Sequence, residues 1–135
     1  MRPHITMLSG DYMTFEMKSL QSGGSPFCIL CTDRSEPESL EHLISKCDGL
    51  TDIRHRITDS MSSICKNAGL DIDLKSLSNS QLTQWILDPT SMNLKQRLNI
   101  NHPITTTLFQ VSRDFCFSID RNRTYKLSKQ SDKNN

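Results

Sequence analysis

The sequence lacks long apolar runs, and this absence limits where the protein can act. No segment approaches the roughly 18 consecutive apolar residues that a membrane-spanning helix needs, and MRPHITMLSGDYM at the start has no signal-peptide-like apolar run. We therefore expect an intracellular protein that does not enter a membrane, with nucleus and cytoplasm equally open. Five cysteines in such a compartment are expected to be thiols or metal ligands, and their odd number argues against a disulfide framework.

Aromatic residues, glycine, proline and net charge are also scarce. Aromatics make up 6% of the 135 residues and hydrophobic residues 35%, with five glycines and five prolines. This apolar content suffices for one small core, which a structural staple would help to stabilise. The net charge of +1 is far from the strongly basic composition typical of dedicated nucleic-acid-binding domains.

The few charges are nevertheless distributed unevenly. Residues 91–135 contain eight Lys/Arg and three Asp/Glu, whereas residues 1–50 contain four and seven. Any contact with RNA or DNA is therefore predicted in the last third, and it should be weak and tolerant of sequence. Solvation of a helix end is the more common role of such basic side chains, and it remains the alternative here. The candidate contacts are Arg113, Arg121, Arg123 and Lys126.

Hydrophobic periodicity predicts a mostly α-helical fold, and no strand pattern is convincing. Apolar residues recur at helical spacing near the start of the chain, over 50–68 and over 104–119, and a shorter helix is expected around Trp85. A capping-box pattern of Ser and Glu predicts another helix from about Glu36 to Lys46.

The chemistry of the sequence is concentrated between Cys28 and Cys47. Together with Cys31 and His42 they form the pattern Cys-x2-Cys-x10-His-x4-Cys. Zinc takes four such ligands in a tetrahedron, and a set that fills all four positions leaves none for a reacting water. The pattern therefore predicts a structural Zn²⁺ and no enzyme. Five positions along a regular helix would put His42 and Cys47 on different sides, and Cys47 can turn back toward His42 if the helix ends or unwinds near Ser45.

Two other interpretations of these residues remain open. The thiols could be unrelated, with His42 on a helix surface and Cys47 a small buried apolar group. A redox-active Cys pair has less support because no βαβ pattern surrounds it. Cys65 and Cys116 are expected in the core because apolar residues flank them. The remaining histidines are expected on the surface, namely His4, His55 and His102.

We divide the chain into three segments on this basis. A small zinc-stapled helical region with flanking helices occupies residues 1–70, a helical extension 71–127 and a disordered tail 128–135. No Ser/His/Asp arrangement, phosphate-binding glycine loop or paired-carboxylate motif indicates an enzyme.

The order of these motifs resembles a known family. LSGDYM, SPFCILC, ESLEHLISKC and LTDIR follow one another as in the zinc-binding region near the C-terminal end of non-LTR retrotransposon reverse transcriptases. WILDPT and LFQVSRDFCFSIDRNR are similar to the helical tail of animal elements of this type. Thr32 and Asp48 depart from the family, which often has Gly soon after the second Cys and a small residue after the last. Besides the metal ligands, the matching positions are Leu8, Gly10, Tyr12, Glu38, Leu43, Arg54, Arg113, Cys116, Arg121 and Arg123.

The resemblance implies the zinc-binding end of a transposable-element protein standing without its polymerase domain, because the chain has no Tyr-x-Asp-Asp motif and no endonuclease. In that family the region is thought to help hold template RNA or target DNA. The chain would then be a zinc-binding module that assists nucleic-acid binding. The alternative is a zinc-stabilised protein-interaction module, in which the apolar stripe from Leu50 to Ala68 binds a partner helix.

Overall fold

The computed structural model describes residues 3–10, 12–32, 35–90 and 102–133, and helices dominate this part of the chain. The mostly helical fold predicted from the sequence is confirmed, since no β-strand occurs among the described residues. The elements are α1 (Pro3–Ser9), α2 (Phe15–Ser22), the π-helical turn η1 (His42–Lys46), the 3-10 turn η2 (Asp48–Leu50), α3 (Thr51–Asn67), the 3-10 turn η3 (Leu74–Ser76), α4 (Asn79–Leu87) and α5 (Thr105–Lys133).

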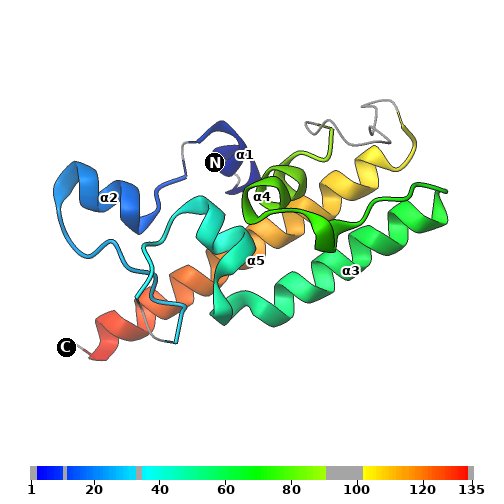
Figure 1. The fold of residues 1–135 in the computed structure, drawn as a ribbon. Coiled ribbons are helices and arrows are strands. Elements are labelled where there is room, and N and C mark those ends of the chain that lie inside the picture. The colour runs from blue at the N-terminus through cyan, green and yellow to red at the C-terminus, as the bar shows by residue number, and fades with distance from the viewer. Residues whose placement is uncertain (1–2, 11, 33–34, 91–101, 134–135) are drawn as a thin grey trace.

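Helix α5 is the scaffold on which the other elements assemble. Helices α1 and α3 both pack against it, and α3 runs in the opposite direction beside it (Figure 1). Helix α4 packs against both η1 and α5, so it connects the turn that carries His42 to the central helix. Helix α2 has no buried residue and lies at the edge of the molecule.

One hydrophobic core joins these helices. The single tryptophan, Trp85, has an exposed fraction of 0%, and Phe115 of α5 is equally buried. Buried core residues come from both sides of residue 70, so the expected boundary there does not separate two cores. The largest contributors besides these two are Met7, Leu43, Ile44, Leu50, Met61, Ile86, Leu108 and Ile119.

Local sequence signals explain where most helices begin and end. Ser78 and Gln81 form a reciprocal capping box at the start of α4, which ends before Asp88 and Pro89. Gly69 ends α3 with a φ of 78°, a conformation that a residue with a Cβ adopts only at a cost.

Two predicted boundaries are wrong. The helix expected from Glu36 begins only at Leu40, because Pro37 lies in an antiparallel bridge with Phe27 and Glu38 is engaged in tertiary contacts. The tail expected at 128–135 is helical through Lys133, since no glycine or proline interrupts α5; residues 134–135 lie outside the described part.

Candidate metal centre

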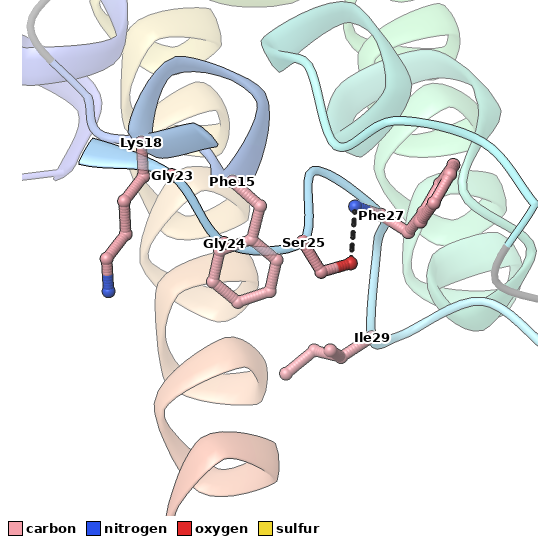
Figure 2. Close-up of a pocket in the computed structure, with 7 residues that line it drawn as sticks. All are labelled: Phe15, Lys18, Gly23, Gly24, Ser25, Phe27 and Ile29. Carbon is pink, nitrogen blue, oxygen red and sulfur yellow. Dashed lines mark hydrogen bonds between the residues drawn. The ribbon is translucent and has the colours of Figure 1, made fainter. Parts of the chain in front are cut away.

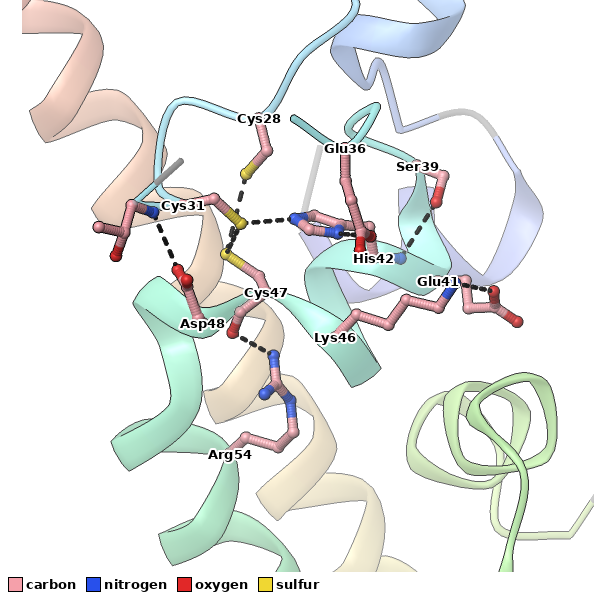
Figure 3. Close-up of polar contacts among 11 residues, drawn as sticks. Cys28, Cys31, Glu36, Ser39, Glu41, His42, Lys46, Cys47, Asp48 and Arg54 are labelled. Atoms are coloured by element: carbon pink, nitrogen blue, oxygen red, sulfur yellow. Dashed lines mark hydrogen bonds and ion pairs between the residues drawn. The ribbon is translucent and has the colours of Figure 1, made fainter. Parts of the chain in front are cut away.

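The four predicted ligands converge on one point (Figure 3). The sulfur and imidazole nitrogen atoms of Cys28, Cys31, His42 and Cys47 all lie within 4.8 Å of one another. Cys31 Sγ is 3.0 Å from His42 Nε2, and the Cys47 sulfur is 3.8 Å from Cys28 Sγ and 3.6 Å from Cys31 Sγ. Three of these side chains are buried and Cys31 is partly exposed, so the cluster sits just beneath the surface.

The cluster fits a tetrahedral zinc ion in both chemistry and size. Zinc–sulfur bonds of about 2.3 Å in a tetrahedron separate neighbouring sulfurs by about 3.8 Å. The two sulfur–sulfur distances of 3.6 and 3.8 Å match that edge, whereas a disulfide would need about 2.05 Å. The sulfur–nitrogen distance of 3.0 Å is shorter than the about 3.5 Å of such a tetrahedron. Three thiols and one imidazole are a donor set that zinc prefers.

The first two ligands come from a loop whose arms are held together. The Phe27–Pro37 bridge closes its base, where Cys28 N–H donates to Glu36 O at 3.1 Å and Glu38 N–H donates to Pro26 O at 2.7 Å. These bonds fix the position of Cys28 before any metal is bound.

The last two ligands lie at the two ends of η1, with His42 as its first residue and Cys47 directly after it, and the geometry of this turn explains their spacing. Cys47 N–H donates to His42 O at 2.7 Å, an i→i+5 bond. A regular α-helix would carry the residue five positions later to another side, but the wider π turn returns it to the side of His42. The chain therefore widens at 42–46 where unwinding was predicted.

Glu36 orients the imidazole of His42. His42 Nδ1 lies 3.1 Å from Glu36 Oε2. Because a carboxylate only accepts, Nδ1 is the protonated nitrogen and Nε2 presents its lone pair to the sulfurs. The sequence pattern predicts only a helix start at Glu36 and does not reveal this role; the one signal in the sequence is a carboxylate six residues before a ligand His.

Arg54 of α3 binds the other end of the π turn. Its guanidinium, buried with 8% exposure, donates to Ile44 O and Cys47 O, both at 2.8 Å. Burial lowers the pKa of Arg54, and the nearby thiols of Cys47 and Cys31 act against that shift. Three thiolates around a divalent ion leave one excess negative charge, which this guanidinium would balance.

The three thiols of the cluster shift one another's pKa values. The hydrogen bond from the Cys47 thiol lowers the pKa of Cys28 to about 5, with help from the Leu30 and Cys31 N–H groups. The same bond raises the pKa of Cys47, which keeps its proton, and burial raises the pKa of Cys31.

The two ligand-bearing segments approach closely at Gly49. A Cβ at this position would overlap the backbone carbonyl of Leu30, which follows Cys28 in the first loop. On the outer side, Thr32 N–H donates to Asp48 Oδ1 at 3.1 Å. The absence of a side chain at Gly49 is therefore needed for this contact.

The remaining cysteines lie away from the cluster, as predicted. Cys65 on α3 and Cys116 on α5 are buried in the core, and burial raises the pKa of both thiols, to about 12 for Cys116. His4 contradicts its predicted surface position, because it is 6% exposed and its Nε2 lies 2.9 Å from Leu87 O. His55 is exposed and His102 half-buried.

The four basic residues predicted to contact nucleic acid have different surroundings. Arg121 and Lys126 are exposed on α5, and Arg113 is half-buried with a hydrogen bond to Gln110. Arg123 is not a surface cation: it is 8% exposed and forms two hydrogen bonds with the fully buried carboxylate of Glu38, at 2.7 and 2.9 Å. The prediction for Arg123 is therefore wrong, because its partner comes from far away in the sequence.

The Glu38–Arg123 pair belongs to a network that joins α5 to the metal-binding segment. Arg123 also donates to Tyr12 Oη at 2.7 Å, Tyr12 donates to Asp120 at 2.8 Å, and Phe15 N–H donates to Glu38 at 2.8 Å. Burial raises the pKa of Glu38, while the Arg123 hydrogen bonds act in the opposite direction. We call this set of five residues the clasp.

A pocket of about 470 Å³ lies between α2 and the first ligand loop (Figure 2). Lys18 is the only ionisable side chain lining it, and Phe27 points away from Ile29 across the loop. The pocket brings no acid–base pair or nucleophile together, so it does not resemble an active site.

Comparisons with protein-family models, with curated proteins and with solved structures found no match. The similarity to retrotransposon reverse transcriptases therefore stays a prediction from the sequence. Among the described residues, no helix combines the length and apolar character that crossing a membrane requires.

Proposed function

We propose that this chain is a zinc-held helical module that assists nucleic-acid binding, similar to the zinc-binding C-terminal region of a retrotransposon reverse transcriptase. The observation that carries the metal part is the convergence of three thiols and the correctly oriented His42 imidazole. Four protein ligands leave no open coordination position, so the metal would be structural and the chain not an enzyme.

The arrangement of charge supports a nucleic-acid role for α5. Arg121, Lys126 and Lys129 are exposed near its end, whereas Arg123 between them is turned inward. The clasp joins this helix to the metal-binding segment, so a bound ion would hold the cations in place. Residues 1–90 carry an acidic excess, which leaves α5 as the surface for phosphate.

Metal analysis tests the first part of the proposal. Protein purified without chelators should contain one equivalent of zinc, released when Cys28 or His42 is substituted. A zinc content below about a tenth of an equivalent in a protein with intact helices would contradict it.

Salt-dependent titration tests the second part. Three or four phosphate contacts predict a log–log slope of roughly −2 to −3 for single-stranded RNA, with dissociation constants near a micromolar or weaker. Deleting residues 124–135 should abolish most binding while keeping Arg123 and the clasp. Equal binding by both chains would contradict a role for the end of α5.

A protein-interaction module remains the second candidate, but on a different surface from the one predicted. The apolar stripe between Leu50 and Ala68 packs inside this protein and is not available to a partner helix. Met61 and Cys65 are buried, and the isoleucines of the stripe pack against the core. Leu20 and Phe27 are the exposed alternative, with exposed fractions of 83% and 42%. Absence of any nucleic-acid binding at low salt would favour this candidate.

A further inference from the structure

We propose that a groove between α3 and α5 binds a single nucleic-acid strand, with Tyr125 as a platform for base stacking; this rests on the proposed function and assigns it a site. The groove encloses about 680 Å³ and lies where the first turns of α3 face the last part of α5. It is independent of the metal ligands, none of which lines it.

The groove has a cation on each wall. Arg56 comes from α3 and Arg121 from α5, and both are exposed. Asp120 also lines the groove, and its carboxylate accepts the Tyr12 hydroxyl at 2.8 Å. Cations on opposite walls suit a phosphate backbone that runs along the groove between them.

Tyr125 supplies the aromatic surface. It lies one helical turn beyond Arg121 on α5, lines the groove and is 64% exposed. Lys129 Nζ lies 5.5 Å from the centre of its ring, so a base stacked there would have a cation beside it. Bases offer their faces to an aromatic side chain only where they are unpaired, which favours a single strand over a duplex.

The rest of the lining favours a nucleic acid over an apolar peptide. Ser118, Asn122 and Ser128 place hydroxyl and amide groups in the groove, and Ile53 is the one aliphatic side chain that lines it. Hydroxyl and amide groups form hydrogen bonds to phosphate, sugar and base edges.

The test uses the full zinc-loaded chain with labelled oligouridine and with an RNA duplex of equal length. We expect tighter binding of the single strand, about tenfold weaker binding by Tyr125→Ala and near-normal binding by Tyr125→Phe, which keeps the ring. Arg56→Gln should weaken binding and reduce the salt slope by about 1. Lys66→Gln, an exposed cation near the other end of α3, is the matched control and should leave the slope unchanged.

The outcomes separate this inference from the proposed function. If the chain binds the strand but Tyr125→Ala binds as well as the unchanged protein, or Lys66→Gln weakens binding as much as Arg56→Gln, the groove is the wrong site and the proposed function stands. Preference for the duplex would likewise overturn the stacking role. If no nucleic acid binds even at low salt, both proposals fail.

Discussion

Cys47 and Cys65 are both buried thiols, yet their neighbours give them different chemistry. Cys47 lies against two other sulfurs, whereas burial alone accounts for the raised pKa of Cys65. We expect Cys47→Ala to lose zinc and Cys65→Ala to retain it at a cost of about 1–2 kcal/mol for the small cavity. Zinc content and urea denaturation measure the two effects. Release of metal by Cys65→Ala alone would show that the ligand set is wrong.

Glu36 allows the orientation of a ligand to be tested separately from its presence. Glu36→Gln keeps His42 but replaces the carboxylate that accepts from Nδ1, and we expect zinc affinity to fall about 10- to 100-fold. Glu41→Gln is the matched control, because Glu41 pairs with Lys46 at 3.4 Å on the surface and does not touch the cluster. Competition with a chromogenic chelator gives both affinities. Equal affinities in the two variants would rule out an orienting role.

At the scale of elements, the metal centre depends on η1 and η2 approaching the first ligand loop. Gly49→Ala places a methyl group against the Leu30 carbonyl, which is backbone and cannot turn aside. We expect a loss of several kcal/mol in unfolding free energy together with weaker zinc binding. Gly69→Ala is the comparison, since its Cβ meets open space and only the positive φ costs about 1–2 kcal/mol. Similar losses in both variants, with normal zinc binding, would contradict the close approach.

At the scale of the whole molecule, the clasp makes α5 and the metal-binding segment depend on each other. Arg123→Gln leaves the carboxylate of Glu38 buried without its partner, and breaking such a pair costs about 3–5 kcal/mol. Arg121→Gln, two residues earlier and exposed, should change stability by less than about 0.5 kcal/mol. Denaturation of both variants checks this. Equal stability would mean that Glu38 and Arg123 do not meet.

Removal of the metal should also reduce the protection of backbone amides in segments other than those that carry its ligands. Among the described residues of 26–38 only Cys28 and Glu38 are buried, so this loop has little apolar burial of its own and chelation should increase amide hydrogen exchange over residues 26–50. Because Glu38 belongs to that segment, the end of α5 should lose protection as well, while the last turn of α3, which lies far from the ligand segment (Figure 1), should change least. Protection lost uniformly along the chain would instead indicate that the ion supports the whole fold.

Features with local causes could be read directly from the sequence. The helical fold follows from apolar periodicity, as over 50–68 and 104–119, and the four ligands follow from the donor types that zinc requires at short spacing. Burial of Cys65 and Cys116 follows from their apolar neighbours.

Features that depend on distant partners were decided by the tertiary structure alone. Arg123 looks like a surface cation in the sequence, and only the packing of α5 brings it to Glu38, 85 positions away. His4 is buried where α1 packs on the body of the protein, with its Nε2 against Leu87 O. Glu36 reaches the His42 imidazole because the Phe27–Pro37 bridge folds its loop back. The π turn that unites His42 and Cys47 is held by Arg54 of the following helix. A polar side chain has several possible partners in a sequence, and packing selects one because leaving it buried and unpaired costs more free energy.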